Sequence, residues 1–369
     1  MHLKNLQLNQ FKNYQSAKLE FSEEINCMVG INGSGKTNLL DAIHYLCLTK
    51  SAVNAQDNQN ILHDMDFFTV FGEFEMAKNS LEIRCIVESG KKKQIIQNGK
   101  AVEKMSDHVG LLPVVMIAPD DTQLIKDGSE ERRRFFDNML CQLDKSYMDN
   151  LVRYQHFLKQ RNALLKKFGE TGRINKALLE PYDLELINLS KLIAATRQEF
   201  VNAYKPLLIE HYADISGKRE TIDIHYDTNC TAEDFERQFY QNQSKDLILR
   251  RSTMGIHKDD FVFEIDNYPI KKYGSQGQQK SFLIALKLAQ FEIFHDKKNT
   301  KPILLLDDIF DKLDDLRIEK LMQLVADHRF GQLFITDARP ERSAGILKGI
   351  NAQAKFFKVE QGHVSAWDQ

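Results

Sequence analysis

The chain has few cysteines, no long apolar stretch and almost no net charge, and each shortage excludes a class of protein. Its five cysteines are odd in number and show no metal-ligand spacing, so we expect reduced core residues and a cytoplasmic location. No apolar run approaches membrane-spanning length, and the start lacks the apolar segment of a secretion signal. We therefore expect neither a secreted nor an integral membrane protein. A net charge of −2 over 369 residues excludes a uniformly basic surface, so any nucleic-acid contact must come from local basic clusters.

A glycine-rich loop lies between a predicted strand and a predicted helix. Residues 24–29 have the pattern of a short buried strand, and residues 38–48 are apolar at helical spacing. Glycines let the backbone approach phosphates closely, and the N–H groups at the helix start face the anion. We therefore expect a nucleoside triphosphate to bind this loop. Its residues are Gly30, Ile31, Asn32, Gly33, Ser34, Gly35, Lys36 and Thr37.

Four side chains have specific expected roles in this chemistry. Lys36 would reach the β- and γ-phosphates, and the Thr37 hydroxyl would bind Mg²⁺. Much later in the chain, an apolar strand runs directly into Asp307 and Asp308. Asp307 fits an acid that holds Mg²⁺, and Asp308 could orient or deprotonate the attacking water. Two adjacent acids can also begin a solvated loop, so these roles depend on the glycine-rich loop upstream.

A second polar helix start lies shortly before the two acids. It offers a hydroxyl, a glycine and free backbone N–H groups, which could form a second anion cradle. Two cradles in one chain are explained if two copies face each other head to tail, each covering the nucleotide of the other. The alternative is a polar, capped helix start without a ligand. The segment consists of Ser275, Gln276, Gly277, Gln278 and Gln279.

Strand patterns occupy both ends of the chain and helical patterns occupy the middle. Alternating apolar residues predict strands within residues 3–21 and 67–102. Residues 130–168 contain neither Pro nor Gly and predict a long helix, and residues 186–207 predict a second one. The pair would form an antiparallel hairpin about 40 Å long, either a short coiled coil or two ordinary amphipathic helices. The expected fold class is α/β, with a phosphate-loop domain interrupted by a helical insertion. The expected segments are 1–118, 119–255 and 256–369.

In this order along the chain, these elements resemble the ABC-type ATPase heads of the SMC group and, within it, the RecF family of bacterial recombination mediators. The most specific match is Ser275-Gln276-Gly277-Gln278-Gln279-Lys280, where other ABC proteins favour a serine and paired glycines. The resemblance spans nearly the whole length and includes residues 8–14, 30–43, 118–121, 132–137, 255–260 and 304–314.

The resemblance implies an ABC-type head with a mixed sheet, ATP and Mg²⁺ as ligands, and weak ATP hydrolysis that acts as a switch. It also implies an ATP-dependent homodimer that binds duplex DNA, single-stranded DNA and gap junctions. The dimer would work with RecO and RecR to load the recombinase RecA. By position, the resemblance assigns Asp314 to the dimer contact. Turnover should be slow, because Asp308 is shorter than the usual glutamate base and residues 335–338 include no histidine.

Several basic residues are candidates for contacts with DNA or nucleotide. The arginine run at 132–134 could meet phosphates or form solvated ion pairs with neighbouring glutamates. A lone histidine at the start of a strand could be structural or functional. The candidates are Lys12, Arg132, Arg133, Arg134, His257 and Lys258.

Three other functions remain open at this point. A transporter ATPase subunit would need a coupling segment where this chain has a helical arm. A small-molecule kinase would be competent as a monomer and would need an acceptor pocket. A chiefly structural SMC-type protein would need a longer arm.

Overall fold

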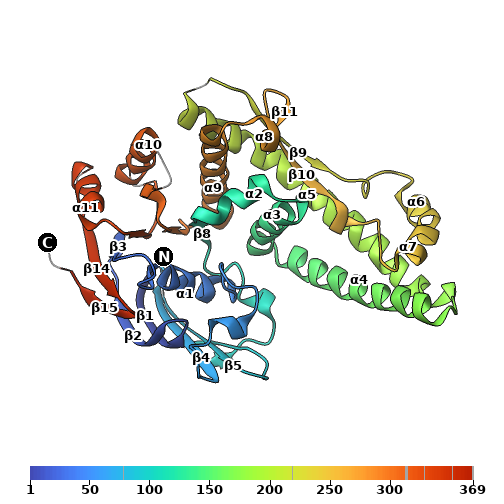
Figure 1. Cartoon of the computed structure of the whole chain (residues 1–369), viewed down its shortest axis with the longest axis horizontal. Coiled ribbons are helices and arrows are strands. Elements are labelled where there is room, and N and C mark those ends of the chain that lie inside the picture. Colours follow the sequence, from blue (N-terminus) through green and yellow to red (C-terminus); the bar gives the residue numbers. More distant parts are fainter. Residues whose placement is uncertain (78, 218, 312–314, 328, 351, 368–369) are drawn as a thin grey trace. The chain divides into compact units, whose positions relative to one another are not determined.

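The computed structural model describes residues 1–77, 79–217, 219–311, 315–327, 329–350 and 352–367. The chain forms two compact units (Figure 1). The first, which we call the sheet unit, comprises Met1–Asp121 and Ile284–Gln369. The second, the helical unit, comprises Thr122–Leu283. The fold is thus the expected α/β head with a helical insertion.

The sheet unit contains two six-stranded sheets. One is antiparallel, in the order β2-β1-β4-β5-β6-β7. Its strands are β1 (His2–Phe11), β2 (Tyr14–Glu20), β4 (Phe67–Glu75), β5 (Ser80–Glu88), β6 (Gln94–Gln97) and β7 (Lys100–Ala101). The other sheet has the order β15-β14-β3-β13-β12-β8 and is parallel except for β15. Its strands are β3 (Ile25–Val29), β8 (Val114–Ile117), β12 (Ile303–Leu306), β13 (Leu333–Asp337), β14 (Ala354–Glu360) and β15 (His363–Ala366).

Helix α1 (Lys36–Leu48) is the central element of the core of this unit. It contacts β1, β4 and β5 of the antiparallel sheet as well as β8 and β13 of the mixed sheet. Ten of its 13 residues are buried, as expected for a helix covered on nearly every side. The loop that precedes α1 is therefore held by a well-packed helix. The other helices of the unit are α10 (Asp315–Ala326), α11 (Pro340–Gly349) and most of α9 (Gln276–Lys298).

The helical unit combines helices with a small antiparallel sheet of order β11-β10-β9. Its strands are β9 (Ile222–Asp227), β10 (Asp260–Ile265) and β11 (Tyr268–Pro269). Its helices are α2 (Gln123–Lys126), α3 (Ser129–Leu143), α4 (Lys145–Thr171), α5 (Glu180–Ser216), α6 (Phe235–Gln241), α7 (Gln243–Leu249), α8 (Ile270–Tyr273) and the start of α9.

Helices α4 and α5 pack side by side as the predicted antiparallel hairpin (Figure 1). With 27 residues, α4 is about 40 Å long. A coiled-coil seam on α5 would contain Leu186, Leu189, Ile193, Thr196, Phe200, Ala203 and Leu207. It is buried at Leu186, Leu189, Ile193 and Phe200 and half-buried at Thr196, but Ala203 is exposed, and Tyr204 and Leu208 are buried instead. The seam thus shifts along the helix, which fits ordinary helix packing better than a regular coiled coil.

Two expectations about the middle of the chain differ from the structure. The long helix predicted over residues 130–168 is two helices, because the Asp144 side chain caps α4 by accepting hydrogen bonds from the backbone N–H groups of Ser146 and Tyr147. The boundary expected after residue 255 differs from the observed division, because β10 pairs with β9 inside the helical unit. Among the described residues, no helix is both long enough and apolar enough to cross a membrane.

Candidate nucleotide-binding site

The glycine-rich loop connects the end of β3 to the start of α1, as its sequence predicts. Gly33 and Gly35 have φ angles of 79° and 117°, in the left-handed region that favours glycine. A Cβ atom at Gly35 would lie 2.6 Å from Asn13 Nδ2 and 2.8 Å from the Tyr14 hydroxyl oxygen. Only glycine fits at this position.

Side chains from the turn between β1 and β2 and from the first residue of β2 donate hydrogen bonds to the loop. Asn13 Nδ2 donates a hydrogen bond to the Ser34 carbonyl (3.1 Å), and the Tyr14 hydroxyl donates to the Gly35 carbonyl (2.9 Å). Asn38 Nδ2 in turn donates to Asn13 Oδ1 (2.7 Å). The carbonyls of Ser34 and Gly35 are therefore engaged by the protein and do not face an anion bound in the loop.

The donors inside the loop match the needs of a phosphate chain. The Lys36 ammonium is buried and donates to the carbonyls of Gly30 (2.7 Å) and Ile31 (3.0 Å). Ser34 Oγ is also buried and has no hydrogen-bond partner among the described residues. A buried hydroxyl without a partner is costly unless a ligand satisfies it. The cradle thus fits a polyphosphate by its shape and by the Ser34 hydroxyl, which has no partner in the described part of the chain.

Asp307 lies directly opposite the start of α1. The Thr37 hydroxyl donates to its carboxylate, with Oγ1 2.9 and 3.0 Å from the two oxygens, although the residues are 270 positions apart in the chain. Burial raises the pKa of the Asp307 carboxyl, and the hydrogen bonds from Thr336 and Thr37 oppose that rise. A hydroxyl and a carboxylate in contact form the kind of oxygen set that suits Mg²⁺.

Thr336 connects the two acids and was not predicted as a site residue. Its hydroxyl donates to Asp307 Oδ1 (2.7 Å) and accepts from the Asp308 backbone N–H (2.8 Å). It can do so because β13 lies between β3 and β12 in the mixed sheet, so its end faces both the loop and the acids. The sequence carries no signal of that strand order.

Asp308 has two unusual features at once. Its φ of 46° lies in the left-handed region, and its Oδ1 is buried without a hydrogen-bond partner among the described residues. Strained backbone and unpaired buried acceptors cluster at functional sites. The geometry therefore marks Asp308 as a candidate to act on a reacting group.

The predicted second cradle, which lies in the helical unit, forms a capping box at the start of α9. The backbone N–H of Gln278 donates to Ser275 Oγ (3.2 Å), and the backbone N–H of Ser275 donates to Gln278 Oε1 (2.7 Å). Gln279 Nε2 donates to the carbonyls of Gly274 (3.1 Å) and Ile270 (3.3 Å). Ser275 and Gln276 are exposed, and Gly277 is half-buried. The segment is thus a stable, accessible helix start.

Most of the predicted basic contacts have partners within the protein. Lys12 is buried in an ion pair with Asp41 (2.6 Å). Arg132 binds both carboxylate oxygens of Asp260 at 2.8 Å. Arg133 donates to the Asp259 carbonyl (2.5 Å) and to Ser129 Oγ (2.7 Å). These three side chains therefore stabilise the fold of their own units.

Three further candidates differ in their surroundings. Arg134 is exposed beside Glu131, with 2.9 Å between Nη1 and Oε1. Lys258 is also exposed. His257 accepts a hydrogen bond at Nδ1 from the Tyr154 hydroxyl (2.6 Å), and its Nε2 faces the Ser252 carbonyl at 3.1 Å. Burial lowers the pKa of His257 to about 4, so it is a neutral structural residue near pH 7. Asp314 lies outside the described residues.

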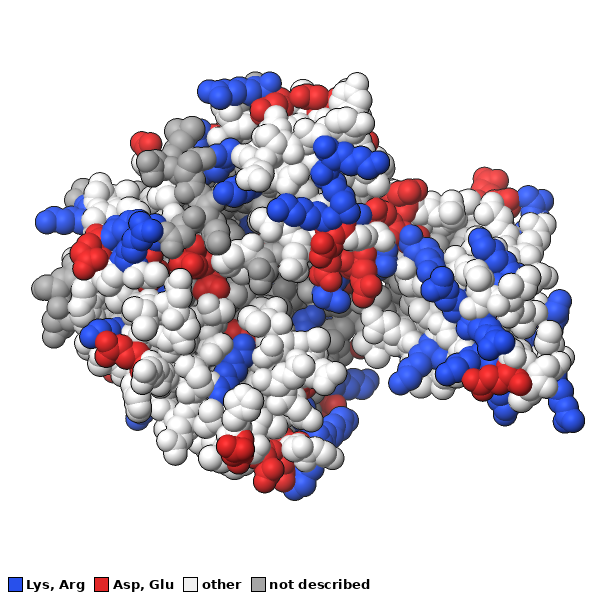
Figure 2. Space-filling model, in the orientation of Figure 1, with Lys and Arg blue, Asp and Glu red and all other residues white. Residues whose placement is uncertain are grey.

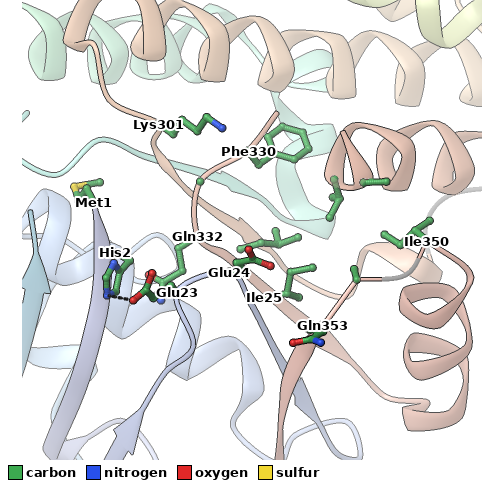
Figure 3. A pocket seen from close by; sticks show the side chains of 15 residues that line it. Met1, His2, Glu23, Glu24, Ile25, Lys301, Phe330, Gln332, Ile350 and Gln353 are labelled. Atoms are coloured by element: carbon green, nitrogen blue, oxygen red, sulfur yellow. Dashed lines mark ion pairs between the residues drawn. The ribbon is translucent and has the colours of Figure 1, made fainter. Parts of the chain in front are cut away.

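A pocket of about 660 Å³ lies at the amino-terminal ends of β3 and β13 in the mixed sheet, whereas the glycine-rich loop follows the carboxyl-terminal end of β3 (Figure 3). Ile25 and Leu333, the first residues of β3 and β13, line it, whereas the loop and Asp307 follow the last residues of their strands. Glu23 and Glu24 also line this pocket. Lys301 lines the pocket as well, so the charges of the pocket are mixed, and none of the residues of the glycine-rich loop lines it.

The chain is similar over nearly its whole length to proteins of one family. The family model described as RecF/RecN/SMC N terminal domain matches residues 2–365. The DNA replication and repair protein RecF of Cytophaga hutchinsonii is 47% identical over 364 residues, which cover 99% of this chain and 96% of that protein. The RecF protein of Flavobacterium johnsoniae is 45% identical over 359 residues, 97% of this chain and 100% of that protein.

Solved structures are similar as well. A structure of the recombination mediator protein RecF with ATP, in the RecFOR pathway, has a TM-score of 0.90 and 28% identity, and the match covers 100% of this chain and 98% of that one. An SMC head bound to the C-terminal winged-helix domain of ScpA has a TM-score of 0.57 and 16% identity, covering 100% and 97% of the two chains. The SMC head shares the fold alone.

Proposed function

Because the chain belongs to the RecF/RecN/SMC N-terminal domain family and, within it, to the RecF DNA replication and repair proteins, we propose that it is an ATP-switched DNA-binding mediator of recombinational repair. The observation that carries this proposal is the contact between the Thr37 hydroxyl and the Asp307 carboxylate. It joins the glycine-rich loop to the acid that an ATP-dependent switch requires. The full-length match to RecF proteins favours this function over the transporter and kinase alternatives.

Each residue around the loop has a task in binding ATP. The loop N–H groups and the Ser34 hydroxyl would hold phosphate oxygens, and Lys36 would leave the loop carbonyls to neutralise the terminal phosphates. Thr37 and Asp307 would hold Mg²⁺, which when bound offsets the negative charge on the phosphates. A structure of a RecF protein with ATP, similar to this chain, supports the choice of nucleotide.

Hydrolysis would depend on the two acids and on Thr336. Asp308 would accept a proton from the attacking water, and Thr336 would fix the positions of both acids through its two hydrogen bonds. The side chain of Asp308 is shorter than that of a glutamate base and reaches less far toward the attacking water. Residues 335–338 include no histidine, so no imidazole there can donate a hydrogen bond to the terminal phosphate. Turnover would therefore be slow, and ATP would serve as a timed switch.

The exposed start of α9 would complete the site of a second copy. Ser275 and Gly277 would face the terminal phosphate bound to the partner subunit, so each copy would cover the nucleotide of the other. ATP would hold this homodimer together, and loss of the terminal phosphate would release it. The closed dimer would bind duplex DNA and single-strand/duplex junctions and would act with RecO and RecR to load RecA.

Sedimentation of the full chain tests this proposal. The native chain should form dimers that carry a short DNA duplex only when ATP and Mg²⁺ are present. Lys36→Met should remain monomeric under the same conditions, whereas Lys18→Met, at an exposed position, should behave as the native chain. A native chain that binds ATP but stays monomeric, or that dimerises without carrying DNA, would contradict the proposed switch.

A further inference from the structure

The exposed positive charge of the helical unit is concentrated at the end of the α4–α5 hairpin. Among the exposed residues of 153–180 and 241–251, nine are Lys or Arg and two are Asp or Glu, an excess of seven positive charges in a chain whose net charge is −2. In Figure 2, blue side chains clearly outnumber red ones over this part of the molecule. Positive charges this close together repel one another and lower the stability of the fold, so their concentration suggests a function.

The two helices of the hairpin differ in their exposed faces. On α4, Lys159 and Lys166 are exposed and seven residues apart, which places them on the same face about 10 Å from each other. On α5, the exposed acids include Glu199 and Glu210, and Lys191 is 3.4 Å from Glu236. The hairpin thus has a basic helix and a more acidic one.

Residues from three segments build the basic surface. A glycine in the last turn of α4 makes room for a cation from another helix: a Cβ atom at Gly169 would collide with the Arg250 side chain, which follows α7. We call this surface the cationic face of the arm. It consists of Lys159, Lys166, Lys167, Arg173 and Arg250.

The cations of this face are available to a partner. Among the described residues, Lys159, Lys167 and Arg173 have no ion-pair partner, and Lys166 approaches only Glu170, at 3.9 Å. Arg132 and Arg133, by contrast, are bound to acceptors within the unit. Two exposed lysines about 10 Å apart on one helix face, Lys159 and Lys166, with Lys167 beside them, suit a polyanion with regularly spaced charges.

We propose that the cationic face of the arm binds the phosphate backbone of duplex DNA, an inference that rests on the DNA-binding function proposed above. The contacts are charge-based and independent of base sequence, so they fix where the duplex lies and make its affinity strongly dependent on salt. The same end of the hairpin exposes Ile174 and Ile248, which suit a protein partner better than DNA. The excess of positive charge favours DNA over a protein partner. Binding of DNA and binding of a protein to this face predict different effects of the substitutions described next.

Titration of the full chain with a labelled duplex of about 30 base pairs, with ATP and Mg²⁺, over a series of salt concentrations, tests the proposal. The test variant is Lys159→Gln/Lys166→Gln/Lys167→Gln, which keeps good helix formers at exposed positions. Its affinity should fall about 30-fold near 0.1 M salt, and the slope of log affinity against log salt should fall by about three. The matched control, Lys18→Gln/Lys100→Gln/Lys104→Gln, changes the same charge at exposed positions of the sheet unit and should stay within about twofold of the native affinity.

The controls separate the possible failures. Both variants should bind ATP as the native chain does and unfold at the same temperature. If the native chain binds the duplex and the test variant matches the control in affinity and slope, the arm does not bind DNA, and a protein partner on Ile248 becomes the better account. If the native chain binds ATP but no duplex, the proposed function and this inference both fall.

Discussion

The interior of the helical unit and the region of the glycine-rich loop both bury polar or charged side chains, but these side chains differ in whether they have hydrogen-bond partners. In the helical unit, all three guanidinium nitrogens of Arg197 are bonded, to the carboxylate of Asp137, the hydroxyls of Tyr147 and Tyr226 and the carbonyl of Ile256. In the loop region, Ser34 Oγ and Asp308 Oδ1 are buried without a hydrogen-bond partner among the described residues.

The contrast teaches how to tell a structural charge from a functional one. Buried ionic groups that satisfy each other specify a packing arrangement, and removing one partner leaves the other uncompensated. Buried polar groups left without partners cost free energy in the empty protein, so beside a loop shaped for an anion they favour a ligand site. Arg197 therefore stabilises the fold of the helical unit, whereas we propose that Ser34 meets a phosphate and that Asp308 meets the attacking water.

The largest effect should follow the loss of Arg161. Its guanidinium is fully buried and contacts Asp183 Oδ1 (2.5 Å) and Asp246 Oδ2 (2.6 Å). Arg161→Met should lower the free energy of unfolding of the helical unit by about 4 kcal/mol, because it leaves two buried carboxylates unpaired. Urea unfolding measures this loss, which should shrink at acidic pH, where the carboxylates take up protons.

Lys36→Met is the matched counterpart, because Lys36 is also buried and donates to the loop carbonyls of Gly30 and Ile31. Its unfolding free energy should stay within about 1 kcal/mol of the native value, while its ATP affinity falls about a hundredfold, since a charge-assisted bond to phosphate is lost. Equal loss of stability in the two variants would remove the distinction between the regions.

A pH series should separate the regions next. Burial lowers the pKa of His257 to about 4, from an unfolded value near 6.5. Below pH 6.5 the unfolded chain takes up a proton that the folded one resists, so stability present at neutral pH is lost as pH falls toward 4. Between pH 7.5 and pH 5 this residue should account for about 2 kcal/mol.

The variant His257→Asn isolates that contribution, because His44 and His108 also have pKa values lowered by burial, and both lie in the sheet unit. The variant is expected to be less stable than the native chain at neutral pH, with the gap closing as pH falls. A constant gap over this range would mean that His257 titrates normally and that the helical unit does not hold it neutral.

A smaller effect is expected from Thr336, and it concerns turnover more than binding. Thr336→Val keeps the shape but removes the donor to Asp307 and the acceptor for the Asp308 N–H. ATP affinity should change less than about threefold, and hydrolysis should fall about tenfold, because positioning of both acids is lost. Thr336→Ser should restore most of the rate. A valine variant that hydrolyses ATP at the native rate would show that Thr336 merely packs.

The sequence predicted the elements whose signals are local. The loop, β3 and α1 follow from periodicity and turn chemistry, and the structure confirms them. The role of Thr336 could not be predicted, because it depends on β13 lying between β3 and β12. Strand order is set by packing over long sequence distances, which a single sequence does not display.

The basic candidates were harder to interpret for the same reason. Arg132 has its partner Asp260 128 residues away, and no sequence window contains both. The break at Asp144, by contrast, had a local cause: an aspartate can cap a helix without any proline or glycine nearby. Apolar periodicity continues across Asp144, so periodicity alone does not show this break.

The smallest change in stability, and the sharpest test of the contrast, concerns Ser275, a helix cap by its contacts and a phosphate ligand by proposal. Ser275→Ala should weaken the first turn of α9 by about 1 kcal/mol, whereas Ser275→Asp should preserve it, because aspartate caps a helix as well as serine does. Hydrogen exchange of residues 276–279 without ATP measures this difference. With ATP, the order of the two variants should reverse when self-association is measured. The alanine variant should keep part of the ATP-driven self-association. The aspartate variant should lose it, because its carboxylate repels the phosphate bound to the partner subunit. Native self-association of the aspartate variant would show that Ser275 is a helix cap and not a phosphate ligand.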